Sequence, residues 1–164
     1  MKAPVSAPIA KPRRVRCAAV SPQPWRNGGG QTRELLTCPT GAAWRLRLSV
    51  ADIQADGLFS VFKGVQRWFV VLDGAGVGLR TAGQSHYLTP DSPPLRFSGD
   101  AAADCWLTDG PTRDLNPSLS PGCLVFNEIN SLARHFRAYG TTLCVDLTVT
   151  EARSEEHTSE LQSR

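Results

Sequence analysis

The alternation of apolar and polar residues over residues 44–51 predicts a β-strand with two unlike faces. One face carries Trp44, Leu46, Leu48 and Val50, and the other carries Arg45, Arg47 and Ser49. A strand of this kind is typical of a sheet that covers a core on one side only. We expect its polar face to look into a pocket.

Short strand-like segments recur along the rest of the chain, separated by clusters of Gly, Pro, Asp and Ser. The predicted strands are residues 15–20, 32–38, 66–72, 77–80, 85–88, 95–97, 104–107, 123–127 and 141–150. Residues 73–76, DGAG, have the composition of a hairpin turn. Residues 130–139 fit either a short helix or an irregular loop, and no longer amphipathic helix is evident. The pattern predicts an all-β barrel or sandwich of short antiparallel strands, and the length fits two successive β modules.

The two ends of the chain differ from its middle. Residues 1–12 carry three spaced prolines, so we expect a disordered leader rather than the apolar core of a signal peptide. Residues 153–164, RSEEHTSELQSR, resemble the translation of a sequencing adapter, so we expect them to be an artefact. The expected domain is residues 13–152, with an incomplete C-terminus and a truncated second module.

Composition excludes several classes of protein. With 41% hydrophobic residues, 20% charged residues and a net charge of +3, the chain matches neither a disordered nor a coiled-coil protein. The longest purely apolar run, residues 68–72, is too short to cross a bilayer. The arginines are scattered beyond residues 13–16, so we expect no nucleic acid partner. Five cysteines without a C-x-x-C pair indicate free thiols in a reducing compartment, which predicts a cytoplasmic protein.

The glycine run in PWRNGGGQTREL, residues 24–35, first suggests a phosphate-binding loop. Such a loop needs a lysine and a helix directly after the glycines. Here Gln31 and Thr32 follow Gly30, and β-favouring residues come next. The run therefore predicts a turn or a close backbone approach to a pocket, not a phosphate cradle.

Neither metal binding nor a hydrolase triad is indicated by the remaining motifs. The two histidines before the adapter-like segment, His86 and His135, lie far apart and in no H-x-H or H-E-x-x-H frame. No serine sits in a G-x-S-x-G elbow, and no spacing favours Cys-His catalysis. We expect no metal and no cofactor.

A set of polar residues remains, and its members are Asn27, Thr32, Glu34, Ser49, Asp52, Ser60, Arg67, Asp114 and Asn116. Each has a structural interpretation beside a functional one. Asn27 can make a turn, Thr32 and Glu34 can form the outer face of a strand, and Asp114 and Asn116 can cap a turn. Spacing alone leaves both interpretations open.

Four ordered motifs resemble the HutD/Ves family: PWRNGGGQTREL, WRLRLSVADI, DGLFSVFKGVQRWFVVLDGAG and LRFSGDAAADCWLTDGPTRDLN. The resemblance covers residues 21–116 closely. It implies a cupin-like, two-module β-barrel associated with bacterial histidine utilisation. Two departures stand out, because Lys63 occupies a usual proline position and Pro117 with Ser118 replaces a hydrophobic pair.

The resemblance also implies a ligand-binding site. Matching motif by motif, its residues are Trp25, Asn27, Gly28, Gly29, Gly30, Thr32, Glu34, Arg47, Ser49, Phe59, Ser60, Arg67, Asp114 and Asn116. Arg47 or Arg67 is expected to hold a carboxylate through paired hydrogen bonds. Asn27 and Thr32 are expected to supply neutral donors and acceptors.

The expected function is metal-independent binding of a small acidic metabolite, such as formylglutamate or urocanate, in a regulatory or accessory role in histidine utilisation. An enzyme that uses Glu34 or His86 for proton transfer is an alternative, with binding alone favoured. A protein-interaction module is another, and a homodimer is also open. We expect no membrane partner.

Overall fold

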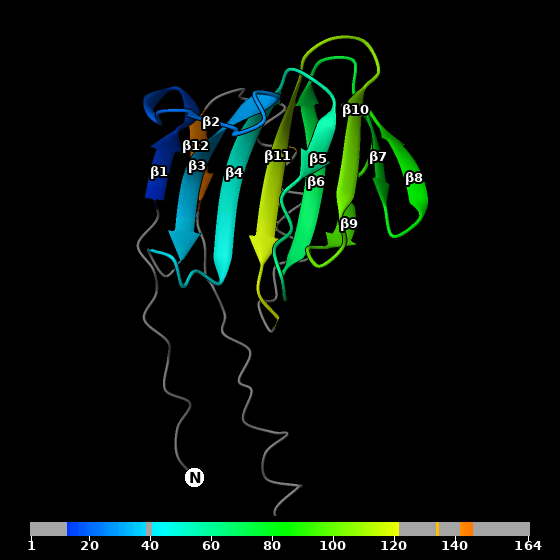
Figure 1. Cartoon of the computed structure of the whole chain (residues 1–164). Helices are drawn as coiled ribbons and strands as arrows, with labels where there is room; N and C mark the ends of the chain where they lie inside the picture. Colours follow the sequence, from blue (N-terminus) through cyan, green and yellow to red (C-terminus); the bar gives the residue numbers. More distant parts are fainter. Residues whose placement is uncertain (1–12, 39–40, 122–133, 135–141, 146–164) are drawn as a thin grey trace, which may run out of the picture.

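The computed structural model is all-β, as the sequence predicts, and describes residues 13–38, 41–121, 134 and 142–145 (Figure 1). The expected leader, the adapter-like segment and the strand at 123–127 lie outside these residues. The truncated second module stays a prediction. No helix within the described ranges is long and apolar enough to cross a membrane.

Six strands form the larger sheet, in the order β2-β3-β4-β11-β6-β9 and antiparallel throughout. Their bounds are β2 (Gln23–Pro24), β3 (Gly30–Cys38), β4 (Leu46–Ile53), β11 (Thr112–Leu119), β6 (Gln66–Asp73) and β9 (Leu95–Ser98). Strands β4, β11 and β6 form its centre.

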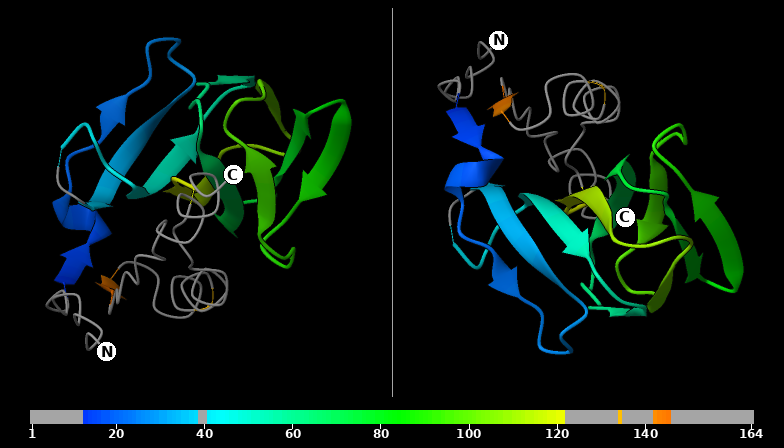
Figure 2. Two further views of the ribbon diagram at one scale, coloured as in Figure 1. Left: turned by 90° about the horizontal axis from the view of Figure 1, so that it is seen from below. Right: turned by 90° about the horizontal axis from the view of Figure 1, so that it is seen from above.

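Four strands form the smaller sheet, in the order β5-β10-β7-β8. Their bounds are β5 (Gly57–Phe59), β10 (Ala103–Leu107), β7 (Val77–Thr81) and β8 (Gln84–Leu88). This sheet lies on the side of β6, away from β1 and β3 (Figure 2). A separate pair joins β1 (Arg13–Arg16) to β12 (Thr142–Val145), and the 3-10 turn η1 (Cys17–Ala19) follows β1.

The central strands bury both of their faces in two different cores. On the outer face, residues of β3, β4, β11 and β6 pack around Cys17 of η1, and this core includes Leu36, Leu48, Trp68, Val70 and Leu115. On the inner face, Ile53, Phe69 and Val71 pack against residues of the smaller sheet. The two faces predicted for the 44–51 segment are confirmed from Leu46 onward, where β4 begins, but the expectation of a core on one side only is wrong, because Ser49 and Ala51 on the other face are buried too.

Three local predictions differ from the structure. The strand expected at 15–20 is wrong beyond Arg16, because residues 17–19 form η1. Strand β11 was not predicted, and the idea that Asp114 and Asn116 cap a turn is wrong because both lie within it. Pro117 argues against a strand in the sequence, since proline has no backbone N–H to donate to a neighbouring strand. The pairing with β4 is continuous, whereas the pairing with β6 skips residues 116–117.

The glycine run is a turn that closes onto the end of β4. Gly28 has a φ of 71°, and the Gly29 carbonyl accepts the backbone N–H groups of Gln54 and Ala55 at 2.8 and 3.0 Å. A Cβ at Gly30 would collide with the Asp52 carbonyl and touch the Trp25 ring. Glycine is therefore favoured at position 28 by its left-handed backbone and required at position 30 by close packing.

Asp52 ties three strands together on the outer face. Its carboxylate accepts hydrogen bonds from Arg113 Nε (2.6 Å), Arg33 Nη1 (2.8 Å) and Gln31 Nε2 (3.1 Å), so β3 and β11 are both joined to β4. Burial alone would raise the pKa of Asp52, but the hydrogen bonds from Arg113, Gln31 and Arg33 outweigh it and lower the pKa.

We expect Gly30→Ala to lower the free energy of unfolding by about 1–3 kcal/mol, because the added methyl must displace the β4 backbone or Trp25. Gly57→Ala is the matched control, since its Cβ would meet only the Asn27 amide and should change stability by less than about 1 kcal/mol. Urea unfolding monitored by tryptophan fluorescence compares the two. Equal losses in both variants would contradict the close packing at Gly30.

We expect Asp52→Asn to destabilise the protein by about 1–3 kcal/mol at neutral pH. A lowered folded-state pKa means that the unfolded chain binds more protons, so the stabilisation is complete above the unfolded pKa of about 3.9 and disappears as pH falls. Between about pH 7 and about pH 3, the difference in unfolding free energy between the two proteins should therefore stay constant down to the unfolded pKa and shrink below it, as pH falls toward the lowered folded pKa. A constant difference in unfolding free energy across this range would show that the charge of the Asp52 carboxylate does not account for the stabilisation of the fold.

Candidate ligand-binding pocket

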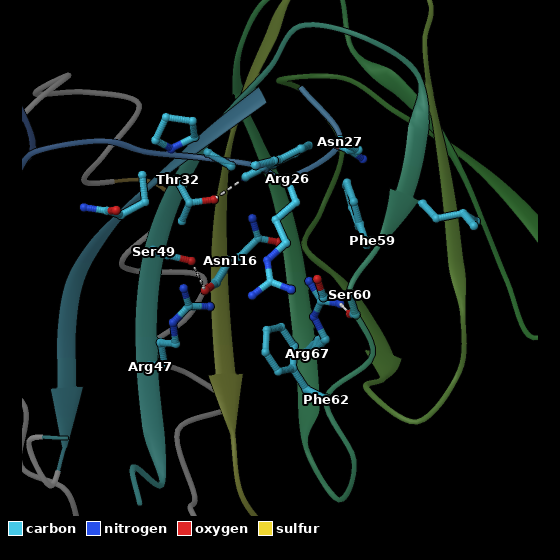
Figure 3. A pocket seen from close by; sticks show the side chains of 15 residues that line it. Arg26, Asn27, Thr32, Arg47, Ser49, Phe59, Ser60, Phe62, Arg67 and Asn116 are labelled. Atoms are coloured by element: carbon cyan, nitrogen blue, oxygen red, sulfur yellow. Dashed lines mark hydrogen bonds between the residues drawn. The ribbon is translucent and has the colours of Figure 1, made fainter. Parts of the chain in front are cut away.

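A pocket of about 450 Å³ opens above the polar part of the inner sheet face. Its floor comes from β3, β4, β11 and β6, and its walls come from residues 23–27 and 58–62 (Figure 3). The lining residues are Gln23, Pro24, Trp25, Arg26, Asn27, Thr32, Arg47, Ser49, Ala51, Leu58, Phe59, Ser60, Phe62, Arg67 and Asn116. The volume is in the range of small-molecule sites.

The structure brings most of the predicted site residues to this pocket. Those that line it are Trp25, Asn27, Thr32, Arg47, Ser49, Phe59, Ser60, Arg67 and Asn116. Gly28, Gly29 and Gly30 form the supporting turn, and Glu34 and Asp114 contact lining residues without lining the pocket. His86 lies on β8 of the smaller sheet, apart from the lining residues, and Asp52 lies on the outer face.

Arg67 is a buried cation at the base of the pocket, with 6% of its surface exposed. Its Nη1 donates to the Ser60 carbonyl at 2.8 Å, and its guanidinium lies 5.0–5.7 Å from the ring centres of Phe59, Phe62 and Phe97. Among the described residues its Nε has no hydrogen bond partner. Burial lowers the pKa of Arg67 to about 10, so the group stays charged at neutral pH.

Two further arginines point into the same pocket (Figure 3). Arg47 Nε donates to Glu34 Oε2 at 2.9 Å, and the Arg47 guanidinium lies 5.7 Å from the centre of the Phe62 ring. Arg26 is exposed and enters from the loop between Trp25 and the glycine run. The lining therefore holds three cations and no acidic side chain.

Neutral polar groups complete the wall. Trp25 Nε1 donates to Thr32 Oγ1 at 2.7 Å, which leaves the Thr32 hydroxyl hydrogen available as a donor. Ser49 Oγ lies 3.5 Å from the Asn116 carbonyl, at the limit of a hydrogen bond. The pocket can thus add neutral hydrogen bonds to the attraction of its arginines for an anion.

Asn116 connects the pocket to a fully buried acid, Asp114. Asn116 Nδ2 donates to Asp114 Oδ2, while Oδ1 of each residue lacks a hydrogen bond partner in the described part of the chain. Burial raises the pKa of Asp114 well above its usual value, and the Asn116 hydrogen bond and the charge of Arg67 oppose this only partly.

The lining residues do not fit a divalent metal. They include no histidine, cysteine or carboxylate, and no group of three such residues elsewhere in the described ranges is placed to hold a metal ion. Amide, hydroxyl and guanidinium groups are the donor set of an anion site rather than a transition-metal site.

Arg26 and Phe62 are the main lining residues that sequence reasoning missed. Phe62 lies in the same FSVF segment as Phe59 and Ser60, so its neighbours were a usable signal. Arg26 stands between two predicted residues, Trp25 and Asn27, and only the folded loop shows its direction (Figure 3).

Comparison with known proteins identifies the family. A sequence model of the HutD family matches residues 17–158. An uncharacterized 21.2 kDa protein from the hutC 3′ region of Pseudomonas putida is 39% identical over 102 residues, covering 60% of this chain and 53% of the relative. Protein Ves of Citrobacter koseri is 35% identical over 94 residues, covering 56% of this chain and 49% of the relative. The chain spans about half the length of these curated relatives.

A solved structure agrees with these sequence matches. HutD from Pseudomonas fluorescens SBW25 is 38% identical with a TM-score of 0.63, covering 68% of this chain and 62% of that chain. The two-sheet arrangement is cupin-like, as the resemblance implied. The fold, the matched segment and the sequence identity agree, and the chain belongs to the HutD family.

Proposed function

We propose that this protein binds a small metabolite with one or more carboxylates in the arginine-lined pocket, without a metal. Its role is that of a cytoplasmic accessory or regulatory protein of histidine utilisation. The family and the hutC 3′ region of the Pseudomonas putida relative support this setting. Formylglutamate and urocanate are candidate ligands because both are small and carry carboxylates.

The observation that carries the proposal is the buried charge of Arg67. A guanidinium that leaves water loses hydration free energy, and a carboxylate partner usually compensates for the loss. Arg67 has an aromatic surround and one carbonyl partner but no carboxylate within ion-pair distance among the described residues. A bound anion would supply the missing partner.

The distribution of the cations favours a ligand with two anionic groups over one with a single group. Arg67 lies deep, whereas Arg47 is partly exposed and Arg26 is exposed, so the positive charges extend from the base toward solvent. A dicarboxylate can contact Arg67 with one group and Arg47 or Arg26 with the other. Trp25 and Phe59 offer apolar surface to the carbon chain between them.

The types of side chain that line the pocket favour binding over acid–base catalysis. Its only ionisable side chains are the guanidinium groups of Arg26, Arg47 and Arg67, and it holds no carboxylate, imidazole or thiol. A general acid or base works best with a pKa near the operating pH and within reach of the ligand. Glu34 contacts Arg47 from outside the lining, and His86 is on the smaller sheet.

We expect Arg67→Met to weaken formylglutamate binding by about 10- to 100-fold, the effect of losing a charged hydrogen bond worth about 1.5–3 kcal/mol. The ligand-free variant should melt at or above the wild-type temperature, because an unpaired buried charge is removed. Calorimetric titration and thermal melting measure the two effects. Arg80→Met is the control, since Arg80 pairs with Asp104 on the smaller sheet at 2.8 Å and should bind normally.

The ligand screen includes formylglutamate, urocanate and histidine, and it uses wild-type protein first. A ligand that binds the folded state raises the melting temperature. If none of the three binds, the proposal is wrong for this pathway. If the Arg67 and Arg80 variants lose affinity equally, the pocket is not where the anion binds.

We expect Glu34→Gln to tighten anion binding by up to about fivefold at low salt, because the exposed pair with Arg47 is worth at most about 1 kcal/mol and competes with the ligand. The catalytic alternative makes the opposite prediction, namely product formation that disappears in this variant. Calorimetry and product analysis by chromatography on the same samples separate the two. Weaker binding by Glu34→Gln would instead show that Glu34 holds Arg47 in its binding orientation.

A further inference from the structure

The Asp114–Asn116 pair leaves two buried oxygen atoms unexplained. Strand β11 places both side chains on its inner face, with Asp114 0% exposed and Asn116 at the pocket. One hydrogen bond joins them, from Asn116 Nδ2 to Asp114 Oδ2. The Oδ1 atoms of both residues are buried and unpartnered among the described residues. Buried acceptors of this kind normally have donors, so a hydrogen atom is missing from this pair.

No neighbouring group among the described residues donates a hydrogen bond to Asp114 Oδ1. Arg67 on β6 acts through its charge but forms no ion pair with Asp114 within the described residues, and Asp52 on β4 adds a repulsive charge. Cys105 faces Asp114 from β10, and burial raises the pKa of this thiol to about 12, so it is uncharged. Ionised Asp114 would be a fully buried charge whose side-chain donor is the neutral Asn116 amide, and burial of this kind favours proton uptake.

We propose that Asp114 is a proton-holding positioning residue: its carboxylic O–H donates to Asn116 Oδ1, Asn116 Nδ2 donates back to Asp114 Oδ2, and this pairing directs the second Asn116 N–H toward the ligand's anionic group. The proposal rests on the function proposed above, and it makes the protonation state of Asp114 a control on ligand binding in the same pocket. It satisfies both orphan oxygen atoms with one hydrogen. It also fixes the orientation of the Asn116 amide, so that the pocket faces an N–H donor rather than the amide oxygen.

Loss of this proton would oppose ligand binding in two ways. A carboxylate behind Asn116 repels the bound anion, and it competes with the ligand for the charge of Arg67. Bound anion therefore raises the pKa of Asp114 further, and binding is linked to uptake of one proton wherever free Asp114 is ionised. In that range the affinity falls by about tenfold per pH unit as pH rises.

The first test asks whether Asp114 carries a proton in the ligand-free protein. Infrared difference spectra of wild type and Asp114→Asn, recorded from about pH 6 to about pH 8, should show a protonated-carboxyl band that only the wild type has. Asparagine keeps the shape and one hydrogen bond of the pair, and thermal melting confirms that the variant folds. Absence of the band throughout this range would overturn the proposal, and the wild-type pH titration of the band decides the matter even if the variant does not fold.

The second test asks whether the proton affects binding. Formylglutamate is the probe, because its carboxylates stay ionised from about pH 6 to about pH 9 and add no titration of their own. Calorimetry should show affinity falling over the pH range in which the infrared band shows Asp114 losing its proton, in wild type and in the control Asp104→Asn, whose carboxylate pairs with Arg80 on the smaller sheet, but a flat profile in Asp114→Asn. Identical profiles in wild type and Asp114→Asn would overturn the positioning role. Failure of wild type to bind at any pH would reject the proposed function and the positioning role, while the infrared band still reports the proton by itself.

Discussion

The burial of β4, β11 and β6 on both faces is the constraint on which the rest of the structure depends. Their outer faces pack into one apolar core, so the outward positions are apolar until the strand ends where Asp52 pairs with Arg113. The inner faces are divided along their length: Ile53, Phe69 and Val71 close a second core, while Ser49 and Asn116 lie at the pocket. A polar residue cannot enter a dry core without a partner, so the pocket occupies the part of the inner face where apolar residues stop.

Arg67 shows how this fold maintains a charge in a place that disfavours it. Three phenylalanine rings and the Ser60 carbonyl replace part of its hydration, and each cation–π contact is worth about 0.5–2 kcal/mol. These neutral partners offset part of the desolvation without neutralising the guanidinium. Burial lowers the pKa of Arg67 to about 10, and the charge of Asp114 opposes this fall. A buried cation of this kind lowers the stability of the free protein, and the anion proposed as its ligand would restore that stability on binding.

Sequence predicted the parts of this fold in which one physical signal acts alone. The alternation in β4 is uninterrupted, so its two faces were correctly predicted from Leu46 onward. Two other strands break the period: the register of β3 shifts between Glu34 and Leu36, and Pro117 interrupts the ladder of β11 with β6. The strand at 32–38 was nevertheless predicted within β3, whereas β11, one of the central strands of the larger sheet, was missed.

The candidate site was harder to predict than the fold, because the direction of a side chain and its depth in the protein are set only in the folded chain. Motif matching brought Asp114 and Asn116 into the site together, yet only Asn116 lines the pocket and Asp114 stands behind it. Arg26 has no period or spacing that would single it out. Its role depends on a loop whose closure needs the backbone of the glycine run.

The gradient of exposure among the three arginines suggests how their work is divided. Arg26 is exposed on the loop, so it retains hydration and can attract an anion from solvent at little cost. Arg67 is buried, held by aromatic rings and preorganised, so it loses little entropy when a carboxylate arrives and interacts with it at low dielectric. Arg47, partly exposed and shared with Glu34, lies between these extremes. For the proposed anionic ligand, the same charge would then act in capture at the mouth and in affinity at the base, because depth decides how strongly water screens each guanidinium.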